Sequence, residues 1–346
     1  MTQNNCMNNS LWALVIFLQT VYSCTTDRDK GVHAKSATPI NILQLKELNT
    51  AQIQKLNKSK TVILIPGGIL EEHGPYLPSF TDGYWNERLT DTIAKAIAAR
   101  KDFNVLLFPT IPLGNSGAND VGMKYSFPGT YTIRFETLRA LFMDIATELG
   151  EQGFKYIFII HGHGAPNHHR ALDQAADYFN ESYDGKMVTL MGLNPIIVNW
   201  FEAPKTKEQE AEDGFTIHAG VAETSSMLYI VPHLVDNGYR NAVPFTGSSM
   251  EELVQIARRS NWKGYFGSQR LATPEFGRQA WASNSKMFTQ FALDILDNKI
   301  NADTVLRFSD YSKGSPVDVV LDSLSLQEER RRKEKQIIWL QKKGLK

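Results

Sequence analysis

The sequence has almost no cysteine and no excess of either charge. Its 346 residues include two cysteines, Cys6 and Cys24, so the chain beyond them has no disulfide, no thiolate metal ligand and no cysteine nucleophile. Lys plus Arg and Asp plus Glu each number 37, and this balance gives no electrostatic reason to expect nucleic acid or an anionic membrane surface as a partner. Catalysis would therefore depend on His, Asp, Glu, Ser, Lys or a bound metal.

The N-terminal segment has the features of an export signal. LWALVIFLQTV, residues 11–21, is mostly apolar and uncharged, too short to span a bilayer but typical of a signal-peptide core. VYSC, residues 21–24, resembles the lipobox of a bacterial lipoprotein. We expect a signal peptide over residues 1–24, export to the periplasm or a membrane lipid anchor on Cys24, with cleavage after Ser23 as the alternative. A polar tether over residues 25–42 follows.

Short apolar runs alternate with amphipathic stretches along the rest of the chain. Four runs fit strands that are buried on both faces of a parallel sheet: residues 61–65, 104–108, 156–160 and 187–191. Helical spacing of apolar residues predicts helices over residues 85–100, 135–153, 169–182 and 274–297. This order predicts an α/β fold, a three-layer α/β/α sandwich around a mainly parallel sheet. The charged stretch 327–346 predicts a helical tail, docked or disordered.

The first candidate site follows the run at 61–65. In EEHGPYLPSFTD, residues 71–82, Glu71 and His73 are two positions apart and face the same side of an extended segment. Ligands of open α/β sheets bind beyond the carboxyl ends of the strands. Asp82 returns after a segment with two prolines, and its two oxygens can bridge two cations. Glu72 is expected to face away from its neighbours.

Two further clusters lie beside other predicted core elements. HGHGAPNHH follows the run at 156–160 and places His161 and His163 at the end of that strand. HAGVAETSS, residues 218–226, contains His218 and Glu223. Carboxylates and imidazoles without sulfur suit Zn²⁺, Mn²⁺ or Fe²⁺ in a hydrolytic site. A single histidine near a strand end is more often structural, and His168 and His169 are expected to open the next helix; the three clusters together favour a metal site.

Four motifs in this order resemble the creatininase (creatinine amidohydrolase) family from about residue 43 to about residue 300. EEHGPYLPSFTD matches the E-x-H-G-x-H-L-P-x-x-T-D motif of the family, with Tyr76 in place of the second histidine. FPGT is present at residues 127–130, and HGHGAPN loosely matches N-G-H-G-G-N. The fourth motif, H-x-G-x-x-E-T-S, begins at His218.

The resemblance implies a metal-dependent hydrolase domain over residues 43–300, followed by an extension over residues 301–346. It implies two divalent ions, Zn or Mn with Fe as a further candidate, and a water that attacks a cyclic or linear amide. The metal ligands implied by the resemblance are Glu71, His73, a bridging Asp82, His163 and, since Ala165 cannot ligate, Glu223. It implies that His218 carries the proton from the water to the leaving nitrogen.

The substrate that the resemblance implies is less defined than the reaction. Family members that open creatinine carry a tryptophan where this chain has Gly214, and a serine and a histidine where it has Val121 and Ser126. Trp200 is a candidate aromatic wall. Three interpretations stay open: an amidohydrolase with another small amide substrate, creatininase proper, and a binding lipoprotein without turnover. The resemblance also implies a homo-oligomer, commonly a hexamer.

If Cys24 carries a lipid, Cys24→Ala should move the protein from the membrane fraction to the soluble fraction, because a buried acyl chain supplies most of the anchoring free energy. Membrane fractionation of wild type and variant, with immunodetection, tests this. Identical partitioning of the two proteins would contradict the lipid anchor.

Overall fold

A parallel sheet of five strands forms the centre of the fold. The computed structural model describes residues 42–100, 102–193 and 203–345. The strand order is β1-β3-β2-β4-β5, and each neighbouring pair is parallel. The strands are β1 (Ile42–Gln44), β2 (Thr61–Pro66), β3 (Asn104–Leu107), β4 (Tyr156–Ile160) and β5 (Lys186–Thr189). The four predicted strands are confirmed, whereas β1, with three residues, was not predicted.

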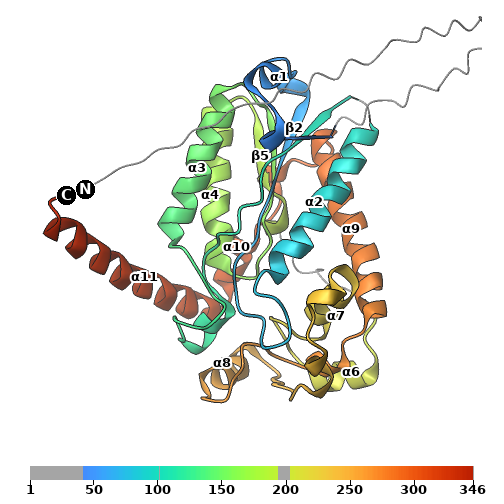
Figure 1. The fold of residues 1–346 in the computed structure, drawn as a ribbon, viewed down its shortest axis with the longest axis vertical. Helices are drawn as coiled ribbons and strands as arrows, with labels where there is room; N and C mark the ends of the chain where they lie inside the picture. The colour runs from blue at the N-terminus through green and yellow to red at the C-terminus, as the bar shows by residue number, and fades with distance from the viewer. Residues whose placement is uncertain (1–41, 101, 194–202, 346) are drawn as a thin grey trace, which may run out of the picture. The chain divides into compact units, whose positions relative to one another are not determined.

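Helices cover both faces of this sheet, as the alternation of β2 side chains shows. Val62 and Leu64 belong to one hydrophobic core, while Ile63 and Ile65 belong to the other. The first core includes side chains of α2 and α9, and the second includes side chains of α3 and α4. Figure 1 shows α3 and α4 on one side of the sheet and α2 and α9 on the other. The predicted three-layer α/β/α sandwich is confirmed, and burial on both faces explains the continuous apolar runs.

The α-helices of the described residues have the following bounds: α1 Thr50–Gln54, α2 Thr81–Ala99, α3 Phe135–Glu151, α4 Pro166–Ser182, α6 Lys207–Asp213, α7 Val221–Ile230, α8 Met250–Arg258, α9 Pro274–Leu296, α10 Phe308–Tyr311 and α11 Pro316–Lys342. None of them has both the length and the apolar composition required to cross a membrane.

Two helices next to the candidate site begin earlier than predicted. α2 begins at Thr81 rather than at residue 85, so Asp82 lies in its first turn and not in the preceding loop. A carboxylate is favourable there because of the partial positive charge of a helix N-terminus. α4 begins at Pro166, three residues before the predicted start, and proline is well tolerated in the first turn of a helix. The earlier starts place Asp82 on α2, and the residues that follow the His163 loop on α4, so both lie on rigid helices.

The C-terminal helix is longer than the predicted tail. α11 begins at Pro316, where Ser315 caps it by accepting a hydrogen bond from the backbone N–H of Asp318. α11 belongs to the same compact unit as the sheet. Ile337, Ile338 and Trp339, near its end, are exposed. The predicted signal peptide, nearly all of the tether and Trp200 lie outside the described residues.

Candidate metal centre

The loops that follow β2 and β4 are tied to each other at the carboxyl edge of the sheet. The side-chain amide of Asn86, on α2, donates to the carbonyl oxygens of Gly67 (2.8 Å) and Gly162 (3.0 Å). Gly67 has no room for a side chain, because a Cβ atom there would lie 1.9 Å from the His161 ring. The first two predicted clusters therefore meet because one buried amide holds both loops and glycine allows their close approach.

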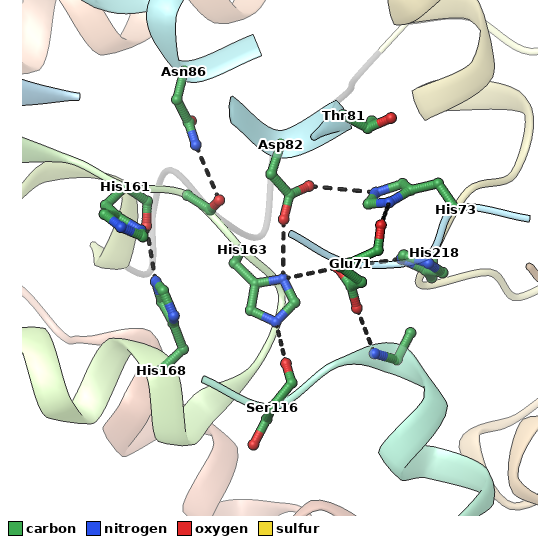
Figure 2. A network of polar contacts seen from close by, with 12 residues as sticks. Glu71, His73, Thr81, Asp82, Asn86, Ser116, His161, His163, His168 and His218 are labelled. Carbon is green, nitrogen blue, oxygen red and sulfur yellow. Dashed lines mark hydrogen bonds and ion pairs between the residues drawn. The ribbon is translucent and has the colours of Figure 1, made fainter. Parts of the chain in front are cut away.

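Three groups of ligand atoms result from this arrangement. Within the described residues, potential ligand atoms lie within 4.8 Å of one another in three sets: Glu71 with His73 and His218, Glu71 with Asp82 and His163, and His73 with Asp82 and Glu223. All six residues that the sequence predicted for the site thus belong to these sets. Glu71, His73, Asp82, His163 and His218 are buried, and Figure 2 shows their side chains converging.

Asp82 occupies the middle of the cluster. Its Oδ1 lies 3.4 Å from His73 Nε2, and its Oδ2 lies 3.1 Å from His163 Nδ1. His163 Nδ1 is also 3.2 Å from Glu71 Oε2, and His73 Nε2 is 3.8 Å from Glu223 Oε2. One oxygen of Asp82 therefore faces His73, which also contacts Glu223, and the other faces His163, which also contacts Glu71. A carboxylate that bridges two cations requires this arrangement.

Two atoms of the cluster that make no hydrogen bond fit a cation. Glu71 Oε2 and His73 Nε2 are buried and make no hydrogen bond; their polar contacts are ion-pair contacts within the cluster, with His163 and Asp82. A buried polar atom without a partner costs about 1–3 kcal/mol, and more when it is charged. Carboxylate oxygen and imidazole nitrogen are ligands of Zn²⁺ and Mn²⁺, so a divalent ion would satisfy both atoms.

Backbone carbonyls set the orientation of three imidazoles. His73 Nδ1 contacts the Glu71 oxygen at 3.2 Å, His163 Nε2 contacts the Ser116 oxygen at 2.5 Å, and His218 Nε2 contacts the Glu72 oxygen at 2.5 Å. A carbonyl only accepts, so the ring nitrogen that faces it carries the proton. In the neutral form of each ring, the other nitrogen has a lone pair directed at the carboxylates, as a metal ligand or proton acceptor requires.

Without metal, the charges of the cluster compensate one another. Burial lowers the pKa of His73, but contact with Asp82 and the charges of Glu223, Asp82 and Glu71 outweigh it and raise that pKa to about 10. Burial likewise lowers the pKa of His163, yet Glu71 and Asp82 hold it well above its usual range. Burial raises the pKa of Asp82, and the neighbouring His163 and His73 nevertheless hold it well below its usual range. In the metal-free protein, protonated His73 and His163 thus supply the positive charge that divalent ions would otherwise supply.

His218 differs from these two histidines. Burial lowers its pKa to about 4, and the charge of Glu71 only partly opposes this effect. Its Nδ1 lies 3.9 Å from Glu71 Oε2, and its ring centroid lies 4.2 Å from that of His73. His218 is therefore a neutral imidazole at neutral pH, with one lone pair facing the ligand cluster.

His168 and His169 support the site without belonging to a ligand set. Both lie in the first turn of α4, as predicted, and both are fully buried. His168 Nε2 contacts the carbonyl oxygen of His161 at 3.2 Å, and His169 Nε2 contacts that of His163 at 2.5 Å. They hold the backbone of the HGHG loop in place. His161 is buried against Phe142 and also lies outside the ligand sets.

Glu72 and the FPGT motif form another support. Glu72 is in none of the ligand sets; its carboxylate accepts a hydrogen bond from the Thr130 hydroxyl, and its backbone N–H donates to the same hydroxyl. Its carbonyl oxygen orients His218. Thr130 therefore positions the segment that carries Glu71 and His73. Burial, followed by the charge of Glu71, raises the pKa of Glu72 to about 9.

Sequence reasoning missed Asn86 and Ser116. Asn86 lies four residues after Asp82 on the same helix, a spacing that could have identified it. Ser116 gave no signal, since it lies in a loop and orients His163 through its backbone oxygen. It adopts φ 58°, which is uncommon for a residue other than glycine and occurs where the surroundings enforce it.

A cavity of about 310 Å³ opens beside the ligand cluster. Glu71, Asp82, His163, His218 and Glu223 contribute to its lining, so a small molecule there would touch the candidate ligands. Val121 and Ala165 also line it. Two other substrate-related positions do not: Ser126 borders a separate hollow, and Gly214 ends α6 with φ 59°.

A buried set of carboxylates and imidazoles at the carboxyl edge of a parallel sheet, open to a small cavity, defines an α/β protein with a candidate hydrolytic metal centre. Residues 46–292 match the creatininase family, described as creatinine amidohydrolase. The chain belongs to the creatininase family and is a creatininase-family hydrolase.

Named relatives illustrate the range of this family. The mycofactocin precursor peptide peptidase of Mycobacterium ulcerans (strain Agy99) is 27% identical over 259 residues, which cover 69% of this chain and 87% of the relative. Creatinine amidohydrolase of Pseudomonas putida is 28% identical over 183 residues, which cover 51% of this chain and 66% of the relative.

Solved structures share the fold. One described as creatininase Mn has a TM-score of 0.53 at 19% identity and covers 74% of this chain and 98% of its own. A Zn–Zn form of a creatininase variant has a TM-score of 0.50 at 20% identity and covers 74% of this chain and 97% of its own. The likeness confirms the predicted fold class.

Asp82→Asn and His163→Ala should each lower metal affinity by more than about tenfold, because even the loss of an outer-shell partner costs 10–100-fold. Metal content after gel filtration, measured by mass spectrometry, tests this. The matched control is Asp91→Asn, a change of an exposed carboxylate on the same helix. Unchanged metal content in Asp82→Asn and His163→Ala would contradict the assignment.

Binding of Zn²⁺ or Mn²⁺ near pH 7 should release protons. The raised pKa values keep His73 and His163 protonated in the metal-free protein, and a ligand must lose its proton to bind metal. Metal affinity should therefore rise between about pH 6 and pH 8. Titration calorimetry in buffers of different ionisation enthalpy counts the protons, and a heat independent of the buffer would rule this out.

Proposed function

We propose that this protein is a metal-dependent amidohydrolase that cleaves a C–N bond of a cyclic or linear, non-peptide amide. The observation that supports this most is the position of Asp82 between His73 and His163, in a cluster whose buried atoms Glu71 Oε2 and His73 Nε2 make no hydrogen bond. Two divalent ions are proposed, with Glu71, Asp82 and His163 around one and His73, Asp82 and Glu223 around the other. Zinc and manganese are the favoured metals, since structural neighbours include Mn and Zn forms; iron is a further candidate.

Divalent ions in such sites act as Lewis acids on a carbonyl and make water nucleophilic near neutral pH. The protein supplies the rest of the chemistry. Asp82 and Glu71 provide negative charge in a buried volume where electrostatic interactions are strong, and the carbonyls of Glu71 and Ser116 keep His73 and His163 in one orientation. The cavity then holds an amide against these side chains.

His218 is proposed to move the proton. Its Nε2–H is held by the Glu72 carbonyl, so the atom that accepts and returns a proton is Nδ1. The lowered pKa keeps this nitrogen unprotonated at neutral pH, ready to take a proton from the attacking water. After the tetrahedral species forms, the same proton passes from Nδ1 to the leaving nitrogen, which completes the exchange without net change in His218.

Creatinine is the second candidate substrate. Family membership and the Pseudomonas putida relative favour it, while Gly214, Val121 and Ser126 depart from the creatinine-opening motif. Relatives named as peptidases make a short peptide a further alternative. A binding protein without turnover would take up metal and bind an amide but hydrolyse none.

His218→Ala should leave metal content near wild type and lower the rate of amide hydrolysis about 10²–10⁴-fold, the usual contribution of a general acid–base group. The assay uses the purified protein loaded with Mn²⁺ or Zn²⁺, with creatinine and a panel of small amides. The control is His233→Ala, a change of an exposed histidine.

Loss of metal from His218→Ala would assign His218 as a ligand, because its Nδ1 also lies near Glu71 and His73. Metal uptake by wild type without hydrolysis of any amide in the panel would favour the binding protein.

A further inference from the structure

The C-terminal helix α11 forms a wall of the cavity at the candidate metal centre. It lies wholly outside residues 46–292, the part of the chain that matches the creatininase family. Asp318, Leu321 and Asp322 line the cavity, and Phe308 of α10 joins them. Part of the cavity lining is thus built from residues that the family match does not include.

One face of α11 holds the helix against the body of the protein. Ser325 Oγ donates to Asp120 Oδ2 at 2.8 Å, and Glu329 accepts from the Asn115 side chain at 2.5 Å and from the Phe135 N–H at 2.9 Å. Asp322, Ser325 and Glu329 follow one another at three- and four-residue steps and therefore share a face of the helix. The position of α11 is set by these buried and half-buried contacts.

The same face connects to a candidate metal ligand. The hydroxyl of Ser116 lies 3.1 Å from that of Ser325, and the carbonyl oxygen of Ser116 orients His163. A single residue thus links α11 to the ligand cluster. This connection fixes the position of α11 relative to His163 and the other candidate ligands.

The charge of the cavity is negative on this wall as well as at the metal centre. Asp120, Asp318 and Asp322 line it in addition to the candidate ligands, and neither lysine nor arginine is among the lining residues. Arg170 and Arg332 oppose the charges of Asp322 and Asp120 from outside the lining. Two divalent ions would carry four positive charges, more than the three negative charges of Glu71, Asp82 and Glu223, so the remaining negative charge of the cavity would lie with the three aspartates of this wall.

Two observations indicate that this wall receives a ligand, and an organic one. The cavity that this wall lines is the one that Glu71, Asp82, His163, His218 and Glu223 also line, so a substrate of the proposed reaction would occupy it. Asp318 and Asp322 belong to none of the groups of metal-ligating side chains found among the described residues. The wall therefore has the charge to attract a cation but lacks the ligand set of a metal site.

We propose that α11 determines substrate specificity, with Asp318 and Asp322 binding an ammonium or guanidinium group of the amide substrate. This rests on the proposed function, because it names the substrate class of the same site. The two carboxylates are one helical turn apart on one face, and a guanidinium group presents several N–H donors that two carboxylates can accept. Leu321, between them in sequence, supplies an apolar surface for the stem that joins the cation to the amide.

The raised pKa values of the wall are consistent with this assignment. Burial raises the pKa of Asp322 to about 7 and that of Asp120 to about 6, and it also raises the pKa of Asp318. A cation bound between them would favour their charged forms and return these values toward the usual range.

The test compares two amide probes of nearly equal shape whose α-amino groups are acetylated, so that the side chain alone differs in charge: argininamide with a guanidinium group and citrullinamide with a neutral urea group. Titration calorimetry measures the binding of each probe to the full chain before and after loading with Zn²⁺. Argininamide should bind at least about tenfold more tightly, the ratio expected for a charge-assisted hydrogen bond. In Asp318→Asn/Asp322→Asn this preference should fall to within about twofold.

The matched control is Glu210→Gln/Glu334→Gln, which removes two exposed carboxylates outside the cavity lining and should keep the full preference. Circular dichroism and thermal unfolding confirm that both double variants fold. Equal affinity for the two probes, no binding of either, or a preference that survives in Asp318→Asn/Asp322→Asn would overturn the proposal.

Metal content is measured on the same samples, so the two hypotheses fail separately. A protein that takes up metal but does not distinguish the probes refutes the role of α11 alone. A protein that distinguishes the probes through Asp318 and Asp322 but takes up no metal refutes the proposed amidohydrolase and supports a cation-binding cavity.

Discussion

The structure depends on the burial of several ionisable side chains in one small volume. Moving a lone carboxylate out of water costs several kcal/mol, and the protein recovers this only when opposite charges and hydrogen bonds surround it. Here Asp82 lies between His73 and His163, and Glu71 contacts His163 from the other side. Cations in this volume, whether protons on imidazoles or divalent ions, are a condition for the folded cluster. The proposed hydrolytic chemistry uses the same electrostatic arrangement.

Most of the surrounding residues act by fixing the backbone that carries the cluster. Asn86 joins the loops after β2 and β4, Thr130 holds the segment around Glu72, and His168 and His169 hold the HGHG loop. Backbone carbonyls then decide which imidazole nitrogen is free. Such preorganisation suits a site where two positive ions would be held at a defined separation. The C-terminal helix, which also lines the cavity, is joined to this framework through Ser325 and Ser116.

Sequence patterns predicted the central fold well because burial on both faces leaves a local mark. β2 and β4 are continuous apolar runs, and the helices over them repeat apolar residues at helical spacing. Helix starts were less well predicted: Asp82 was expected in a loop and lies in the first turn of α2. Contacts from the FPGT segment and from α4 reach the site from distant parts of the chain, and the local sequence pattern does not predict them.

The sequence by itself determined the chemistry available to this protein. With cysteine confined to the first residues, the candidate ligands are carboxylates and imidazoles, and the resemblance of their motifs to the creatininase family implied Glu71, His73, Asp82, His163 and Glu223. Only the tertiary structure decided which oxygen of Asp82 faces which histidine, and that Asp318 and Asp322 of α11 line the same cavity. The physical reason is that side-chain chemistry and periodicity are local properties of the sequence, whereas the contacts of the site are long-range. The distance between residue 82 and residue 322 is set by the packing of the whole chain.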